Sequence, residues 1–216
     1  MPNLFTTPRS IAVEGPLRVG KSSLARLLAE KMNARTVIEP ENNPFLDRFY
    51  RQEPGMAFAA QMWFLLERYE RLHAKPDAAE VVERPVISDF IFDKDKLFAY
   101  LNLSDAELEI YNRYYERFRP EIAPPSLVIY LQATPDVLKT RLKRKAAPGE
   151  RAVSEQYIER VADAYEHYFF HYTASPLLVV NTSEIDFVNN AQHRAQLLAR
   201  IEQPVNGTQY FRPQKS

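Results

Sequence analysis

Glycine is scarce in this sequence, in which 216 residues contain only five, namely Gly15, Gly20, Gly55, Gly149 and Gly207. A dinucleotide-binding G-x-G-x-x-G loop cannot be placed on those positions. No aspartate lies three residues before any of them, which excludes the Asp-x-x-Gly switch of GTPases. No two glycines are adjacent, so the Gly-Gly centre of a transporter-ATPase signature is excluded as well.

Cysteine is absent, which excludes disulfides, thiol nucleophiles and cysteine-based metal sites. This absence is typical of a reducing compartment. The sequence has neither a signal-peptide core near its N-terminus nor a run of about 18 apolar residues, so we expect a cytoplasmic protein without a membrane span. The 28 basic and 28 acidic residues balance, whereas a non-specific nucleic-acid binder carries a basic excess, so we expect no nucleic-acid partner.

Short apolar runs alternate with segments of helical periodicity along the chain. The apolar runs predict strands at residues 10–14, 35–39, 86–90, 126–132 and 176–181. The periodic segments predict helices at residues 22–32, 43–51, 54–73, 104–118, 134–144, 154–172 and 186–201. Continuously apolar strands are typical of a parallel sheet covered by helices on both faces. We therefore expect one α/β domain over residues 1–203, with a five-stranded parallel sheet, followed by a flexible tail over residues 204–216.

Two of the five glycines lie five residues apart, directly before a lysine. Residues 15–22 read GPLRVGKS, which matches the Walker A pattern G-x-x-x-x-G-K-S between an expected strand and an expected helix. Backbone N–H groups and the helix N-terminus would hold phosphate, Lys21 would reach the β- and γ-phosphates, and Ser22 would ligate Mg²⁺. The pattern predicts an ATP and Mg²⁺ site formed by Gly15, Pro16, Leu17, Arg18, Val19, Gly20, Lys21, Ser22 and Ser23.

Carboxylates near the ends of the expected strands are candidates for the chemistry, because ligands of an open α/β sheet lie beyond the carboxyl ends of its strands. Glu39 closes the second strand beside the phosphate loop, where it could accept a proton from an attacking hydroxyl. A solvated loop acid is the alternative. Asp89 lies near the end of the third strand, and Glu83 precedes that strand together with Arg84.

Gln61 and Arg68 form a polar pair on the longest expected helix. They are seven residues apart, which is nearly two turns, so both point from one face. They either face a pocket or lie at the rim of a core, with the alkyl stem of the arginine buried and its head in water. The pattern alone leaves both interpretations open.

Taken together, these segments resemble the deoxynucleoside kinase family, in particular its bacterial deoxyadenosine/deoxyguanosine kinase branch. The resemblance extends from about residue 10 to residue 201 and rests on residues 38–46 (IEPENNPFL), Gln61 with Arg68, residues 88–92 (SDFIF) and residues 176–187 (PLLVVNTSEIDF). It implies a P-loop kinase fold and ATP-dependent phosphorylation of the 5′-hydroxyl of deoxyadenosine, deoxyguanosine or deoxycytidine. It also implies a homodimer.

The resemblance assigns roles on the side of the phosphate acceptor. Glu39 would be the general base that takes the proton from the 5′-hydroxyl. Gln61 would hydrogen-bond the substrate base through its amide, which both donates and accepts. Arg68 and Asp89 would pair to complete the base pocket, and Glu150 would contact the 3′-hydroxyl of the sugar.

On the nucleotide side, the resemblance places Arg141 on the adenine of ATP and lines the adenine site with Asp186 and Phe187. The segment Glu83-Arg84 resembles the Glu-Arg-Ser segment of the family, although proline replaces the serine here. By this likeness Glu83 would lie near the metal and Arg84 near the phosphates.

A short charged segment at about residues 145–152 resembles the lid of the family. That lid brings two arginines to the transferring phosphoryl group, and here Lys145 and Ala147 stand in their places. Lys145 keeps the charge without the planar fork of a guanidinium, and Ala147 keeps neither. This departure leaves open a nucleotide-binding subunit without transfer activity. A nucleoside-monophosphate kinase is a second alternative, although only Glu83-Arg84-Pro85 approaches the Asp-Arg-Tyr-like segment of that class.

Overall fold

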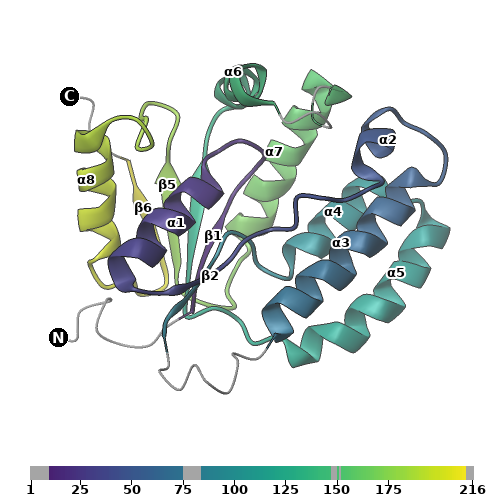
Figure 1. Ribbon diagram of the computed structural model, residues 1–216, viewed down its shortest axis with the longest axis horizontal. Helices are drawn as coiled ribbons and strands as arrows, with labels where there is room; N and C mark the ends of the chain where they lie inside the picture. Colours follow the sequence, from purple (N-terminus) through teal and green to yellow (C-terminus); the bar gives the residue numbers. More distant parts are fainter. Residues whose placement is uncertain (1–9, 75–83, 147–149, 151, 213–216) are drawn as a thin grey trace.

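The structure is a computed structural model that describes residues 10–74, 84–146, 150 and 152–212. A parallel sheet runs through it in the order β2-β3-β1-β4-β5-β6 (Figure 1). Its strands are β1 (Ser10–Glu14), β2 (Arg35–Val37), β3 (Val86–Ser88), β4 (Leu127–Gln132), β5 (Leu177–Asn181) and β6 (Thr208–Phe211). The expected parallel α/β architecture is confirmed, but the sheet has six strands rather than five.

The sixth strand lies in the segment that the sequence predicts to be a flexible tail. β6 pairs in parallel with β5 from Leu177↔Thr208 to Val180↔Phe211. Phe211 packs against the core, and Arg200 reaches Gln209 from the preceding helix. The tail prediction is therefore wrong for this segment, because its backbone completes the hydrogen bonds of β5 and its aromatic residue covers apolar surface.

The two faces of the sheet are covered by different helices. The side chains of Ile11 and Val13 point to a core shared with α1 (Lys21–Met32) and α8 (Ala191–Ile201). The intervening Ala12 points to a second core, formed with α7 (Glu155–Phe170). This alternation follows from the two-residue period of a strand, and each face is apolar because each is buried.

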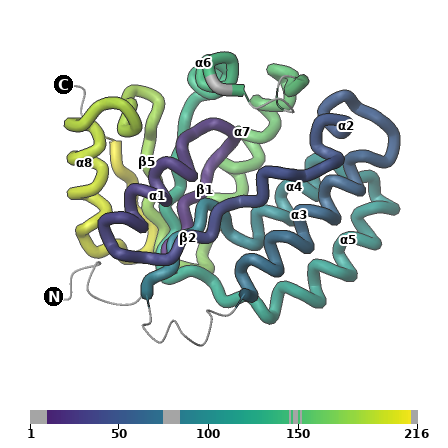
Figure 2. The backbone as a smooth tube through the Cα atoms, in the orientation of Figure 1, coloured from purple at the N-terminus to yellow at the C-terminus, as the bar shows by residue number. Residues whose placement is uncertain are grey.

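A group of helices stands beside the second face and builds a third core (Figure 1). It comprises α2 (Leu46–Tyr50), α3 (Met56–His73), α4 (Lys94–Asn102), α5 (Asp105–Phe118) and the short 3-10 helix η1 (Arg119–Glu121). The remaining helix, α6 (Pro135–Lys145), is not part of this group and precedes α7 in the chain. The core of the group includes Leu65 from α3 and Tyr111 from α5. Figure 2 shows the chain crossing from β2 into this helical group. The group therefore forms a wall beside the carboxyl ends of the strands.

Several element boundaries differ from the expected ones. The second and third strands end at Val37 and Ser88, before Glu39 and Asp89, so both acids lie in connections rather than in strands. Helix α8 begins at Ala191 rather than at Asp186, because the Asn190 side chain accepts hydrogen bonds from the first turn. Helix α4 was not expected at all. Among the described residues, none of the helices combines the length and apolar character needed to cross a membrane.

Candidate active site

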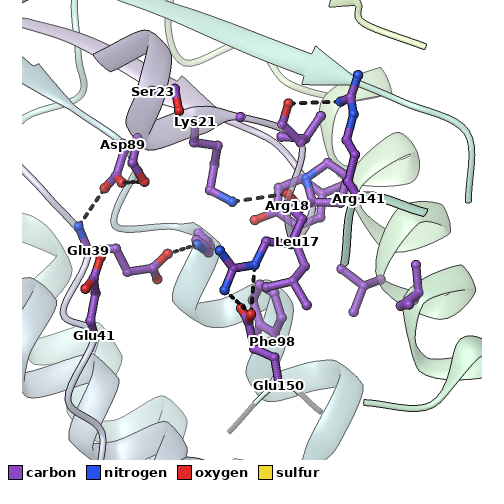
Figure 3. A pocket seen from close by; sticks show the side chains of 18 of the residues that line it. Leu17, Arg18, Lys21, Ser23, Glu39, Glu41, Asp89, Phe98, Arg141 and Glu150 are labelled. Atoms are coloured by element: carbon purple, nitrogen blue, oxygen red, sulfur yellow. Dashed lines mark hydrogen bonds and ion pairs between the residues drawn. The ribbon is translucent and has the colours of Figure 1, made fainter. Parts of the chain in front are cut away.

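A cavity of about 1320 Å³ opens at the carboxyl ends of the strands. Single-ligand pockets measure roughly 300–1,000 Å³, so this one has room for two ligands. It brings together most of the residues selected from the sequence, namely the phosphate loop from Pro16 to Ser23, Glu39, Gln61, Arg68, Asp89, Arg141, Glu150, Asp186 and Phe187. Figure 3 shows Lys21, Glu39 and Asp89 around one space, with Arg18 and Glu150 opposite them. Of the two interpretations of Gln61 and Arg68, the structure supports side chains that face a pocket rather than side chains at the rim of a core.

The phosphate loop connects β1 to α1, and its two glycines occupy positions that other residues cannot. Gly15 has φ +146°, and an added Cβ would lie 2.3 Å from the carbonyl oxygen of Leu131. Gly20 has φ +114°, and an added Cβ would lie 2.7 Å from Cζ of Phe187. The loop is therefore wedged between β4 and the connection that follows β5, and its shape depends on both glycines.

Glu14, the last residue of β1, is a fully buried carboxylate behind the phosphate loop. Its Oε2 accepts hydrogen bonds from the N–H of Gly15 (2.9 Å) and the hydroxyl of Tyr165 (3.0 Å), and its Oε1 accepts one from the N–H of Ile91 (3.0 Å). Burial raises the pKa of this carboxyl. Sequence reasoning missed Glu14, although a carboxylate that ends an apolar strand directly before the Walker glycine was a usable signal.

Lys21, the Walker lysine, turns its ammonium toward the loop itself. Nζ donates to the carbonyl oxygen of Gly15 at 2.9 Å. Burial and the nearby charge of Lys94 lower the pKa of Lys21 to about 8, against the opposing pull of carboxylates such as Glu14 and Glu39. Lys21, the lysine expected to bind the phosphates, therefore lies near a second buried ammonium, that of Lys94.

Glu39 lies between two buried cations. Its Oε1 accepts hydrogen bonds from the guanidinium of Arg68, with Nε at 3.1 Å, and its Oε2 accepts one from Nζ of Lys94. Burial opposes ionisation, but Lys94, Arg68 and Lys21 outweigh it and hold the pKa of this carboxyl well below its usual range. Glu39 is therefore an oriented, ionised carboxylate facing the phosphate loop, and the solvated-acid alternative does not apply.

Asp89 has different neighbours from those that the sequence predicts. It directly follows β3, next to the phosphate loop, and its Oδ2 accepts a hydrogen bond from the Ser22 hydroxyl at 2.5 Å. Its Oδ1 accepts one from the N–H of Glu39 at 2.6 Å. The predicted pair of Arg68 with Asp89 is wrong, because the arginine is paired instead with Asp95, six residues further along the chain.

Asp95 is the fully buried centre of a polar network under Gln61 and Arg68. It accepts hydrogen bonds from Nε2 of Gln61 (2.6 Å), from the hydroxyl of Tyr111 (2.8 Å) and from Arg68. The backbone carbonyl of Asp95 accepts a second bond from the same Gln61 nitrogen at 3.0 Å. Because both partners of that nitrogen are acceptors, the carbonyl oxygen of Gln61 is the amide atom left to accept a hydrogen bond from a ligand in the cavity.

Arg141 links the phosphate loop to the connection after β5. One guanidinium nitrogen donates to the carbonyl oxygen of Val19 (3.2 Å), and the other donates to that of Thr182 (2.7 Å). Asp186 and Phe187 lie in the same cavity, and Phe187 touches the phosphate loop as described above. The three residues predicted for adenine therefore lie together.

Glu150, a described residue of the predicted lid, reaches the phosphate loop. Its Oε2 accepts a hydrogen bond from Nε of Arg18 at 2.7 Å, and the two side chains form an ion pair (Figure 3). The lid acid and the loop arginine thus meet in the lining of the cavity.

Arg84 does not belong to this site. Val86 of β3 is paired with Ser10, the first residue of β1, so Arg84 lies at the amino end of the sheet. The phosphate loop follows the last residue of β1, at the opposite edge. The prediction of Arg84 near the phosphates is therefore wrong. Glu83, Ala147 and the side chain of Lys145 lie outside the described part of the structure.

With this geometry established, the chain was compared with known proteins. Residues 11–206 match the family described as deoxynucleoside kinase. The chain belongs to the deoxynucleoside kinase family. As a deoxynucleoside kinase it is a phosphotransferase that catalyses ATP-dependent phosphorylation of a deoxynucleoside, a reaction of nucleotide salvage. This membership confirms the resemblance. It favours a deoxynucleoside kinase over a nucleoside-monophosphate kinase and over a nucleotide-binding subunit without transfer activity.

Two of the curated relatives match this kinase over nearly their whole length. The deoxyguanosine kinase of Bacillus subtilis is 31% identical over 92% of this chain and 99% of the relative. The deoxyadenosine kinase of Lactobacillus acidophilus is 26% identical over 89% of this chain and 94% of the relative. A solved structure of deoxyadenosine kinase from M. mycoides with bound dATP covers 90% of this chain and 100% of its own, with a TM-score of 0.74 and 21% identity. At that identity the likeness shows the fold.

Proposed function

We propose that this kinase transfers the γ-phosphoryl group of ATP to the 5′-hydroxyl of a deoxynucleoside carrying adenine, guanine or cytosine, with Glu39 as the general base. The observation that carries the proposal is the position of Glu39, which is oriented by Arg68 and Lys94 in one cavity with the phosphate loop. The transition state of phosphoryl transfer is loose, so positioning of the hydroxyl matters more than a strong base. An ionised, fixed carboxylate can supply that positioning.

Ser22 and Asp89 are the residues that we assign to Mg²⁺. Mg²⁺ takes hard oxygen ligands, and in kinases it is held by one or two side chains together with the substrate phosphates. The hydroxyl of Ser22 and the carboxylate of Asp89 are adjacent beside the phosphate loop, which fits this requirement. Within the described residues, no three His, Cys, Asp or Glu side chains gather as a metal cluster. When bound, the ion would neutralise charge on the phosphates.

Gln61 and Arg68 are proposed as the contacts of the substrate base, with Asp95 beneath them. The donor that we assign to the carbonyl oxygen of Gln61 is an exocyclic amino group, which adenine, guanine and cytosine carry and thymine lacks. The named activities of the relatives, deoxyguanosine kinase and deoxyadenosine kinase, support the same choice. Glu150 is proposed for the 3′-hydroxyl of the sugar, since it lines the same cavity as Glu39 and Gln61.

The other half of the cavity is proposed to bind ATP. The phosphate loop would hold the phosphates, with Lys21 released from Gly15 toward them. Arg141, Asp186 and Phe187 would surround the adenine, in keeping with their common position next to the loop. Lys145 is proposed as the cation of the lid.

We further propose a homodimer in the cytoplasm. Two large apolar side chains are exposed on helices that contact one another, Tyr100 on α4 (58%) and Phe170 on α7 (79%). Burial of these two side chains against a second copy would remove apolar surface from water, which is the main driving force of association. The absence of cysteine supports a reducing compartment. Sedimentation velocity of the wild type would test the dimer, and a single monomeric species would contradict it.

The test of the proposed activity is an ATP-coupled assay with deoxyadenosine, deoxyguanosine, deoxycytidine and thymidine. We expect turnover with at least one of the first three, little with thymidine, and a loss of about 100-fold or more in kcat for Glu39→Gln, which cannot take the proton. Product formation from deoxynucleoside monophosphates but not from nucleosides would overturn the proposal. So would tight binding of ATP and nucleoside without transfer.

A further inference from the structure

Lys94, which the sequence analysis did not select, is a buried lysine that lines the cavity. It is the first residue of α4, its side chain is 5% exposed, and Nζ donates to Oε2 of Glu39. The ammonium also lies 5.7 Å from the ring centroid of Phe98, one turn further along α4. Lysine is rarely buried to this extent unless it is paired, and here its partner is Glu39, the proposed general base.

The hydrogen bonds of Lys94 leave it able to bind a ligand. An ammonium carries three N–H donors. Among the described residues, Glu39 is the one hydrogen-bond partner that the structure gives to Nζ. The remaining donors therefore have no protein acceptor in that part of the chain, and the side chain borders a cavity that would hold substrates. Donors of a buried cation need partners, and an oxygen atom of a bound ligand would satisfy them.

The charges around Lys94 indicate which ligand atoms these would be. Arg68 already pairs with the other oxygen of Glu39, so the carboxylate does not depend on Lys94 for its only counter-charge. Lys94 also acts on Lys21, whose pKa it lowers. Lys94 is therefore close to both the proposed general base, Glu39, and the phosphate-loop lysine, Lys21. Charge between those two groups develops on the transferring phosphoryl group.

We propose that Lys94 is a catalytic residue whose ammonium donates a hydrogen bond to the transferring phosphoryl group while it keeps Glu39 beside the 5′-hydroxyl. This inference rests on the proposed function. In the step, the 5′-oxygen forms a bond to the γ-phosphorus and the bond from that phosphorus to the β–γ bridging oxygen breaks. ADP leaves with the electron pair, and the hydroxyl proton passes to Glu39. Lys94 remains protonated and stabilises the charge on the phosphoryl oxygens.

The first experiment compares Lys94→Met and Lys94→Arg with the matched control Lys96→Met in steady-state kinetics. Lys96 lies two residues further along the same helix and contacts the rings of Tyr100 and Tyr115 rather than the cavity. We expect Lys94→Met to lower kcat by about 100-fold or more with KM values for ATP and nucleoside within about threefold, since the contact is made in the transition state. Lys94→Arg should recover much of the loss, and Lys96→Met should match the wild type.

The second experiment separates a catalytic contact from a structural one. Calorimetry would measure binding of ADP with aluminium fluoride and deoxynucleoside, which mimics the planar transferring group, and separately of a non-hydrolysable ATP analogue and of the nucleoside. We expect Lys94→Met to lose affinity for the fluoride complex only. Equal losses for all ligands would assign Lys94 to structure and overturn the proposal.

Two further outcomes are decisive. If Lys94→Met does not fold, Lys94→Gln keeps a donor to Glu39 without the charge, and a folded variant with kcat within about threefold of wild type overturns the proposal. The same result for a folded Lys94→Met overturns it too. These failures leave wild-type activity intact, whereas a wild type that binds ATP and nucleoside without transfer refutes the proposed function and this inference together.

Discussion

At the scale of single residues, Glu14 shows how one buried carboxylate orders the site from behind. Its three partners, Gly15, Ile91 and Tyr165, are all donors and come from three different segments. In Glu14→Gln an amide NH₂ would face at least one of those donors, so we expect the free energy of unfolding to fall by about 1–3 kcal/mol. Urea denaturation measures this loss.

Tyr165→Phe is the matched control for that substitution. It removes one donor and leaves the carboxylate with its two backbone partners, so it should cost about 1 kcal/mol, less than Glu14→Gln. Equal stability of Glu14→Gln and wild type would show that these three hydrogen bonds do not order the loop.

A second prediction at this scale concerns the pH dependence set by Arg68. Burial raises the pKa of Glu39, whereas Lys94, Arg68 and Lys21 lower it further than burial raises it. A carboxyl with a lowered pKa stays ionised above that value, so Glu39 should impose no acid limb on the wild-type kcat/KM between about pH 5 and 8. Arg68→Gln removes one of the lowering charges, so the acid limb should move to higher pH.

The measurement is the pH profile of kcat/KM, with each profile scaled to its own maximum so that a weaker base contact does not obscure the shift. Arg48→Met is the control, because Arg48 is exposed and pairs with Glu53 away from Glu39. An acid limb at the same pH in wild type and Arg68→Gln would refute the role of this arginine in keeping Glu39 ionised.

At the scale of elements, the phosphate loop depends on Gly20, and Gly55 offers a comparison. Both have positive φ, +114° and +75°, but an added Cβ meets Cζ of Phe187 at 2.7 Å in the first and nothing within 4 Å in the second. Gly20→Ala should therefore weaken binding of a non-hydrolysable ATP analogue by about tenfold or more, since the loop must shift away from the phosphate position. Gly55→Ala should cost about 1 kcal/mol of stability with unchanged ATP affinity.

Calorimetric titration and thermal denaturation of both variants check this pair of predictions. Equal ATP affinities of Gly20→Ala and Gly55→Ala would show that contact with Phe187 does not shape the loop.

Elements with a strong local pattern could be predicted from the sequence, whereas α4 and β6 could not. The Walker loop and the long helices carry local patterns, and both were found. Helix α4 begins with Lys94 and Asp95, two charged residues of the kind usually found at the surface, yet both are buried. Their charges are neutralised by residues far away in sequence, Lys94 by Glu39 and Asp95 by Arg68. A pattern along the chain cannot show such pairing. β6 is four residues long and only partly buried, so its alternation was too short to distinguish from a tail.

At the scale of the whole molecule, the direction of the strands decides which predicted acids and bases can act. All strands are parallel, so their carboxyl ends share one edge, and Glu39 and Asp89 were correctly placed there by that rule. Arg84 lies at the amino edge of the same sheet, although it is only five positions from Asp89. The resemblance to the Glu-Arg-Ser segment misplaced Arg84, because the three-residue strand β3 lies between it and the carboxyl edge. The partner of Arg68 needed the three-dimensional arrangement of α3 and α4.

The common edge also leads to a prediction about both substrates at once. One cavity of about 1320 Å³ is lined by the predicted base contacts, the phosphate loop and the predicted adenine contacts. A single molecule that joins adenosine to the deoxynucleoside through a chain of phosphates should therefore engage both halves together. Linking makes the second contact intramolecular. The affinity of the linked compound should therefore exceed that of the ATP analogue and that of the deoxynucleoside by about 100-fold or more.

Thermal denaturation with equal concentrations of the linked compound, the ATP analogue and the deoxynucleoside measures this effect, because a ligand that binds the folded state raises Tm by an amount that grows with the logarithm of its affinity. Chains of four, five and six phosphates would find the span between the two halves. Lys21→Met should reduce the shift for the linked compound and for the ATP analogue but leave the shift for the deoxynucleoside unchanged. A shift from every linked compound no larger than that of the ATP analogue would mean that the two halves of the cavity are not occupied together.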